Sequence, residues 1–345
     1  MKKQIKRIII ANTGKIRSMV LSIPTFFLAK KMYPEAEIVV LARRYNYEIA
    51  RNLPYIDRIF ILEDYKKTEV EDKIAYFNAD AFIALNEDKY LEKMAKASRA
   101  KIRIGPIRSF SALLTWNKGA VQLRSKAAKN EGEYNIELLK KLNRKLYAEN
   151  YTLNTKLWLS PAGKVAADAF FKSGNIAGPV LVVNPFTAGS GKNLSDEQYA
   201  ALLKKFHAKN RDVRVIILCE IDQEDRAAKL MENAGNEGIL IFPNGGDLLN
   251  IAAVIDKGSL YLGPVAGPTQ MAGALRKPAI VICPARPNYG RERWGLLGDE
   301  KAIYITPDGR PGKKENYRKK NFETYDREVE DLILTELGKF FRFHA

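Results

Sequence analysis

A turn rich in glycine and proline carries the residues best suited to bind an anion. Gly267 and Pro268 follow an apolar run and open a predicted helix, with Thr269 and Gln270 in its first turn. The first backbone N–H groups of a helix have no partner within it, so such a turn is a ready anion site. An ordinary βαβ unit explains the spacing equally well.

A second loop, residues 187–192, has the sequence Thr-Ala-Gly-Ser-Gly-Lys. Its glycines permit close backbone approach, Thr187 and Ser190 can donate hydrogen bonds, and Lys192 supplies a positive charge for phosphate. The spacing is not that of a Walker loop, because the first glycine is misplaced and Asn193 replaces Ser or Thr. The alternative is a flexible surface turn with a solvated lysine.

Carboxylates follow two predicted strands. Glu220 and Asp222 come after a strand that ends at Leu218, where they could meet a ribose hydroxyl, although a solvated acidic loop is an equal alternative. Glu87 and Asp88 come after the strand 81–85. A plain surface turn is the simpler interpretation of the second pair.

The elements that must position these residues alternate between strands and helices. This alternation predicts an α/β fold with parallel, doubly wound sheets. The length predicts two domains, over residues 1–160 and 161–322. A C-terminal helix is expected over 323–345, and one option for it is to pack back on the N-terminal domain. The predicted strands are 7–11, 37–41, 58–62, 81–85, 100–104, 179–183, 213–218, 239–242, 260–262 and 279–283. The predicted helices lie near 18–32, 45–51, 69–77, 91–97, 134–142, 162–172, 195–208, 223–233 and 247–255, and one more opens at 267.

Composition narrows the class of ligand. The net charge of +17 favours anionic partners, whereas no nucleic-acid-binding signature is present. Cys219 and Cys283 lie in apolar runs and are expected to be buried free thiols. With two His and two Cys, a structural zinc site is not expected. No apolar run reaches membrane-spanning length and no signal peptide is expected.

Read in order, several segments resemble glycosyltransferase family 9, the lipopolysaccharide heptosyltransferases. They are residues 8–15 with 21–24, 33–44, 53–60, 103–106, 134–139, 182–187 with Lys192, and the turn at Gly267. The resemblance implies a GT-B fold, with two Rossmann-like domains facing across a cleft. It implies an inverting, metal-independent transfer of a sugar, usually heptose from ADP-heptose, to a lipopolysaccharide core. No cofactor is implied, and the expected location is cytoplasmic, peripheral to the inner membrane.

The resemblance also assigns residues. It places the acceptor in the N-terminal half, near Thr13, Lys15, Arg17, Lys66, Lys67 and Arg108, and the nucleobase near Asn244. The family's presumed base is an Asp, and here Arg17 and Ser18 stand at its Gly-Asp pair. Val265 and Gln270 replace an Asp and a His of the family's turn. Because an unassisted serine is too weak a base, Glu87 and Asp88 are the replacement candidates. The alternative is a catalytically silent nucleotide- or glycan-binding protein.

Overall fold

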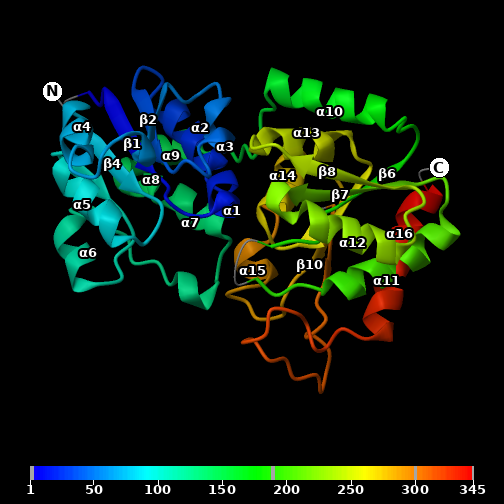
Figure 1. Ribbon diagram of the computed structural model, residues 1–345. Coiled ribbons are helices and arrows are strands. Elements are labelled where there is room, and N and C mark those ends of the chain that lie inside the picture. Colours follow the sequence, from blue (N-terminus) through cyan, green and yellow to red (C-terminus); the bar gives the residue numbers. More distant parts are fainter. Residues whose placement is uncertain (1–3, 188–190, 299–300, 344–345) are drawn as a thin grey trace. The chain divides into compact units, whose positions relative to one another are not determined.

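The chain forms two compact units, residues 1–158 and 159–345, close to the expected boundary at residue 160. This description rests on a computed structural model, which describes residues 4–187, 191–298 and 301–343. Each unit has its own parallel sheet with helices packed on it (Figure 1). Both cores are apolar, and Cys219 and Cys283 are buried free thiols, as predicted.

The first unit is built on a five-stranded sheet in the order β3-β2-β1-β4-β5. All four strand pairs are parallel. The strand order reverses between β1 and β4, and ligands of such sheets bind at the carboxyl ends of the strands beside that switch point. The strands are β1 (Arg7–Ala11), β2 (Glu37–Ala42), β3 (Arg58–Ile61), β4 (Ala81–Ala84) and β5 (Ile102–Ile104).

The helices of the first unit differ from the prediction in several places: residues 144–150 form a helix that was not predicted, and the helix expected over 134–142 is divided into 131–137 and 139–142. The helix expected over 18–32 is split at Ser22, whose hydroxyl donates to the Ser18 carbonyl (2.8 Å) and accepts from the Asn12 side chain (2.7 Å). Helix α6 was not predicted. The helices are α1 (Ile16–Val20), α2 (Ile23–Met32), α3 (Glu48–Arg51), η1 (Leu62–Asp64), α4 (Val70–Tyr76), α5 (Lys89–Ala97), α6 (Phe110–Thr115), η2 (Arg124–Lys126), α7 (Glu131–Glu137), α8 (Leu139–Leu142) and α9 (Arg144–Asn150).

The second unit repeats the plan with six parallel strands in the order β11-β10-β9-β6-β7-β8. Its switch point lies between β6 and β9. Edge strand β11 was not predicted; it pairs with β10 from Ala279↔Ala302 to Ile282↔Ile305. The strands are β6 (Val180–Val183), β7 (Arg214–Glu220), β8 (Ile239–Asn244), β9 (Leu260–Pro264), β10 (Ala279–Ile282) and β11 (Ala302–Ile305).

Helix starts in the second unit follow the capping chemistry of the sequence. The Ser195 hydroxyl accepts from the Gln198 N–H (3.2 Å), and the Gln198 side chain accepts from the Ser195 N–H (2.8 Å), which confirms the predicted capping box. The helices are α10 (Pro161–Ser173), α11 (Asp196–Lys209), η3 (Ile221–Gln223), α12 (Glu224–Ala234), α13 (Leu248–Lys257), α14 (Gly267–Ala274), α15 (Arg291–Trp294) and α16 (Arg327–Phe343).

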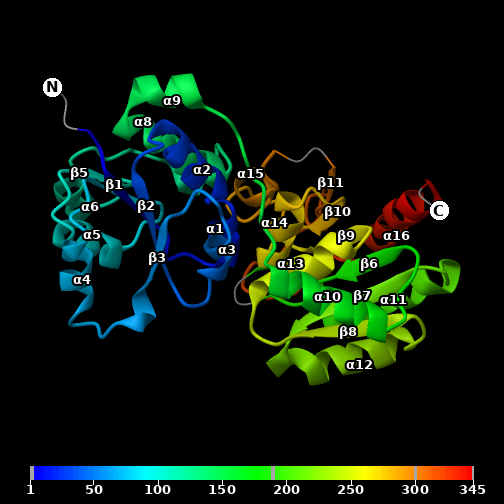
Figure 2. The same ribbon diagram turned by 90° about the horizontal axis from the view of Figure 1, so that it is seen from above.

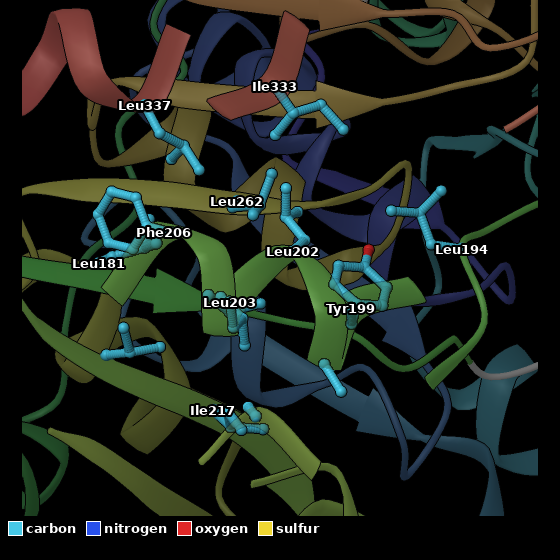
Figure 3. Packing of buried hydrophobic residues seen from close by; sticks show 14 of the residues in the cluster. Leu181, Leu194, Tyr199, Leu202, Leu203, Phe206, Ile217, Leu262, Ile333 and Leu337 are labelled. Carbon is cyan, nitrogen blue, oxygen red and sulfur yellow. The ribbon is translucent and has the colours of Figure 1, made fainter. Parts of the chain in front are cut away.

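The C-terminal helix belongs to the second unit. Ile333 and Leu337 of α16 are fully buried in the same cluster as Phe206 of α11 and Leu262 of β9 (Figure 3). Both ribbon views place α16 beside α11 (Figure 2). The apolar face of α16 therefore packs on the second unit's own core.

Candidate functional site

The loops after β1 and β4 meet at the switch point of the first sheet. The Thr13 N–H donates to the side-chain oxygen of Asn86 (3.1 Å), and the Thr13 hydroxyl donates to Oδ2 of Asp88 (2.9 Å). Tyr45 adds a hydrogen bond from its hydroxyl to the Thr13 carbonyl (2.6 Å). The structure thus joins Thr13 and Asp88, which the sequence assigned to acceptor binding and to the base.

Ser18 lies in α1, shortly after this loop, and is buried. Its hydroxyl lies 3.2 Å from the side-chain nitrogen of Asn12, which also donates to the Ser18 carbonyl (3.1 Å). A serine needs a neighbouring base to lose its proton, and the amide of Asn12 is not one. The hydrogen bonds of Ser18 therefore suit a structural residue of the turn.

A cavity of about 330 Å³ opens beside the same loop. Its lining includes Glu87, Asp88, Arg108 and Trp116. Oε2 of Glu87 pairs with the exposed Arg108 guanidinium (2.7 Å). Oδ1 of Asp88 instead accepts from the Tyr90 N–H (2.8 Å) and caps α5. The cavity thus combines a carboxylate that can take a hydroxyl proton with a cation that can hold an anionic group.

The other predicted acceptor residues lie away from this cavity. Lys15 and Arg17 follow β1, and Lys66 and Lys67 follow η1 beyond edge strand β3. Lys15, Lys66 and Lys67 are exposed, and Arg17 is half-buried. None of the four lines the cavity, so the structure brings together only part of the predicted set.

Arg124 contacts the end of β4, which precedes the cavity loop, through bonds that the sequence did not indicate. Its buried guanidinium donates to the Leu85 carbonyl at the end of β4 (2.9 Å) and pairs with buried Glu131 of α7. It also donates to the side-chain oxygen of Asn135 (3.2 Å). Arg124 therefore fixes the loop that carries Glu87 and Asp88, and no local sequence signal separates it from the exposed cations nearby.

The predicted donor residues gather at the carboxyl edge of the second sheet. Thr187 and Lys192 follow β6, and α14 begins directly after β9 at Gly267 and Pro268, without a side-chain cap. These are the two loops of the switch point, where a diphosphate would meet the open end of a helix. Ser190 lies outside the described residues.

The sequence suggests either a lysine that binds phosphate or a solvated lysine of a surface turn. In the structure, the side chain of Lys192 is buried. Its ammonium pairs with Oε1 of Glu315 (2.6 Å) and donates to the Asn321 carbonyl (2.9 Å). Burial alone would raise the pKa of Glu315, but the hydrogen bonds from Lys192, from both donors of Thr324 and from the Glu323 N–H hold it below its ordinary value. A phosphate that uses Lys192 has to displace a bound carboxylate.

The side chains of Thr269 and Gln270 are also engaged within the unit. The Thr269 hydroxyl bonds to the Pro264 carbonyl and lies 3.1 Å from the Tyr261 hydroxyl. The amide of Gln270 donates to the Trp294 carbonyl (2.6 Å). Both side chains are buried, so these two residues hold α14 in place. The Gln270 N–H donates to the Ala266 carbonyl (3.3 Å), so a ligand would meet the helix start before Gln270.

Glu220 and Asn244 form a third group at this edge, at the ends of β7 and β8. The Asn244 amide donates to Oε2 of Glu220 (3.1 Å), and Oδ1 of Asn244 is buried with no protein partner. Burial raises the pKa of Glu220; the Asn244 bond opposes this shift and the Asp222 charge adds to it. Asp222 itself is exposed. The unpartnered amide oxygen suits a ligand donor.

Within residues 4–187, 191–298 and 301–343, no group of three metal-ligating side chains comes together. In the same described part of the chain, no helix has the length and apolar character needed to cross a bilayer.

The fold is that of the GT-B glycosyltransferases. The solved structure of ADP-heptose lipopolysaccharide heptosyltransferase II of Escherichia coli superposes with a TM-score of 0.77 at 15% identity, over 99% of this chain and 100% of that one. The family model of glycosyltransferase family 9 (heptosyltransferase) matches residues 78–305. The chain therefore belongs to glycosyltransferase family 9, which confirms the resemblance drawn from the sequence.

Two relatives in sequence support the same family assignment. A protein of Haemophilus influenzae assigned as a glycosyltransferase is 23% identical over 95% of this chain and 96% of its own length. Lipopolysaccharide heptosyltransferase 3 of Escherichia coli is 20% identical over 76% of this chain and 79% of its own length. The chain is thus a heptosyltransferase-like glycosyltransferase.

Proposed function

We propose that this protein is an inverting glycosyltransferase that moves a heptose or related sugar from an ADP-linked donor to a lipopolysaccharide core or a similar anionic glycan. The observation that carries the proposal is the cavity beside β4, in which Glu87 and Asp88 lie with Arg108. Family membership supplies the reaction class. The relatives named as heptosyltransferases, one of them with ADP-heptose in its name, support the proposed donor and acceptor.

In the proposed reaction, Glu87 takes the proton of the acceptor hydroxyl. The oxygen then attacks the anomeric carbon opposite to the leaving nucleoside diphosphate, so the configuration inverts. Arg108 holds an anionic group of the acceptor and releases Glu87 from their ion pair (2.7 Å) as it does so. Asp88 keeps its place as partner of Thr13 and cap of α5, and it positions the loop rather than taking the proton.

The donor is proposed to bind at the carboxyl edge of the second sheet. The start of α14 at Gly267 faces the diphosphate and stabilises the charge that develops as the sugar leaves. Thr187 adds a hydroxyl from the loop after β6. Asn244 offers an unpartnered oxygen to the nucleoside, and Glu220 and Asp222 lie where a ribose hydroxyl would meet them.

The protein is further proposed to work at the cytoplasmic face of the inner membrane, as a peripheral protein. A net charge of +17 supports attraction to an acidic surface. Each basic residue close to such a surface contributes about 1 kcal/mol, an effect that fades beyond a Debye length. The acceptor is itself an anionic glycolipid in this proposal, so enzyme and acceptor meet at one surface.

The competing function is a silent protein that binds nucleotide or glycan without turnover. The two are separated by incubating the protein with a panel of nucleotide sugars and measuring nucleoside diphosphate release with and without acceptor. Acceptor-dependent release of ADP supports the transferase. Tight nucleotide binding without release, across the panel, supports the binding protein.

A further inference from the structure

Helix α6 exposes its large apolar side chains and buries its small ones. Phe110, Leu113 and Leu114 are 75%, 55% and 66% exposed, whereas Ala112 and Thr115 are buried. Residues three and four positions apart share one side of a helix, so the three large side chains form one apolar surface. A surface helix ordinarily has the opposite arrangement. Figure 1 shows α6 at the edge of the first unit, next to α5.

The apolar exposure continues in the loop that follows α6. Val121 and Leu123 are 77% and 55% exposed. The Ile107 N–H donates to the Ala120 carbonyl (2.8 Å), which ties this loop to the residues that precede α6. We call residues 107–126 the α6 segment. A local concentration of exposed apolar side chains marks an interaction surface.

The charged residues within the α6 segment are all cations, namely Arg108, Lys118, Arg124 and Lys126. Arg108 pairs with Glu87, and Arg124 pairs with Glu131. Between positions 93 and 130 the chain has ten Lys or Arg and no Asp or Glu. Lys118 and Lys126 are exposed and lie within the α6 segment itself. A short apolar surface flanked by cations has the composition of a segment that lies in the interface of an anionic bilayer.

We propose that the α6 segment is the surface by which this protein docks on an anionic lipid bilayer. Phe110, Leu113 and Leu114 enter the interface between headgroups and acyl chains, and Lys118 and Lys126 reach the lipid phosphates. The proposal rests on the membrane attachment proposed above and names the residues that make it. A second copy of the chain fits less well, because it would bring two cation-rich segments together.

A fluorescent label on the α6 segment tests this directly. Cys219 and Cys283 are buried, so a polarity-sensitive thiol reagent will label Leu114→Cys selectively. With vesicles of phosphatidylglycerol and phosphatidylethanolamine, we expect a blue shift and a several-fold rise in emission. The same label at Val165→Cys, on an exposed position of α10, will not respond. Vesicles of phosphatidylcholine alone will give little signal at either site.

Removing the apolar surface gives a second measurement. The variant Phe110→Ser/Leu113→Ser/Leu114→Ser will partition to anionic vesicles at least about tenfold less than the wild type, because three side chains no longer enter the interface. All three are exposed, so the variant will fold, and thermal unfolding verifies this. The matched control replaces exposed apolar residues elsewhere and keeps wild-type partitioning: Tyr76→Ser, Val165→Ser and Leu332→Ser.

The outcomes separate the inference from the proposed function. If the wild type fails to bind anionic vesicles, the attachment and the inference both fall, while transfer to a water-soluble acceptor still tests the enzyme. If it binds, but the label at position 114 stays silent and the triple variant binds normally, only the inference is overturned. A label that responds to protein concentration without vesicles identifies a second copy as the occupant, which also overturns the inference.

Discussion

The hydroxyl of Thr13 donates a 2.9 Å hydrogen bond to Oδ2 of Asp88, and this bond joins the loops after β1 and β4. It lies at the switch point of the first sheet, where the order of the strands reverses. The next residue back, Glu87, belongs to the same loop but pairs with Arg108 on the cavity side. Glu87 and Asp88 are adjacent in sequence, but their side chains therefore lie in two different environments.

This difference predicts unequal effects for two isosteric changes. Glu87→Gln is expected to lower kcat by about 100-fold or more, the loss expected of a general base, with little change in nucleotide affinity. Asp88→Asn is expected to lower kcat less, because an amide still caps α5 and still accepts from Thr13. Steady-state rates of nucleoside diphosphate release measure both, with calorimetry for nucleotide binding.

The control for this pair is Thr13→Val, which removes the hydroxyl that holds Asp88. It is expected to resemble Asp88→Asn rather than Glu87→Gln. A Glu87→Gln enzyme with wild-type kcat, beside an inactive Asp88→Asn, would reverse the roles of the two carboxylates.

Placing the family's aspartate at position 18 is not expected to increase heptosyl transfer strongly. Ser18 is buried against the neutral amide of Asn12, so Ser18→Asp places a carboxylate in a buried position. We expect a loss of about 3 kcal/mol or more in the free energy of unfolding and no large gain in heptosyl transfer. Urea denaturation and transfer assays measure the two effects. A strong gain in transfer would show that the site at Ser18 is intact.

Strand periodicity was a reliable guide to this fold, because buried parallel strands are continuous apolar runs. Arg7–Ala11 was predicted with its bounds, and the neighbouring strands differ by a few residues. Edge strand β11 was missed because Ala302–Ile305 is short and half-exposed. Helix α6 was missed because its apolar residues face outward, which hides the pattern of an ordinary surface helix.

The buried pair of Lys192 and Glu315 is expected to stabilise the second unit. Lys192→Met leaves a buried carboxylate without its cation and should cost about 3–5 kcal/mol in the free energy of unfolding. The double variant Lys192→Met/Glu315→Gln should recover part of this loss. Chemical denaturation of the three variants gives the coupling, and an additive double variant would mean that the two side chains do not interact.

The same pair gives a test of nucleotide binding. If the donor diphosphate uses Lys192, then Glu315→Gln removes a competing charge and should raise ADP affinity, whereas Lys192→Ala should lower it by about 1–3 kcal/mol. Calorimetry with ADP, UDP and GDP measures this. Unchanged affinity in both variants would remove Lys192 from the donor site and leave it a structural role only.

The pH dependence of stability follows from the lowered pKa of Glu315. A carboxyl whose pKa is lower in the folded state stabilises the protein above its unfolded pKa, near 4.3, and this contribution is lost as the pH falls through the folded value. The difference in unfolding free energy between the wild type and Glu315→Gln should therefore shrink from pH 7 to acid. If the difference in unfolding free energy stays constant with pH, the pKa of Glu315 is not lower in the folded state than in the unfolded state.

Arg124 is expected to be essential for the cavity although it does not line it. Arg124→Met leaves Glu131 buried without its partner and frees the Leu85 carbonyl, at a cost of about 3–5 kcal/mol. A neighbouring control, Lys126→Met, changes an exposed cation and should leave the free energy of unfolding nearly unchanged. Equal effects of the two changes would contradict a supporting role for Arg124.

The site was less predictable than the fold, because side-chain pairs between distant segments have no local signal. Lys192 and Glu315 are far apart in sequence, and nothing near Lys192 indicates that its ammonium is already bound. Thr269 and Gln270 lie at the expected helix start, but the partners of their side chains come from Pro264 and Trp294. The local capping bonds of Ser195 were predictable, whereas the side-chain partners of Lys192, Thr269 and Gln270 were not.

The most direct test of the central claim is the stereochemistry and acceptor dependence of transfer. The protein is incubated with ADP-heptose and a truncated lipopolysaccharide core, ADP release is followed, and the product is examined by NMR. The account predicts acceptor-dependent release, an inverted anomeric configuration, and loss of both release and product with Glu87→Gln. Nucleotide binding without acceptor-dependent release from any ADP-, UDP- or GDP-linked sugar would contradict it and identify a binding protein.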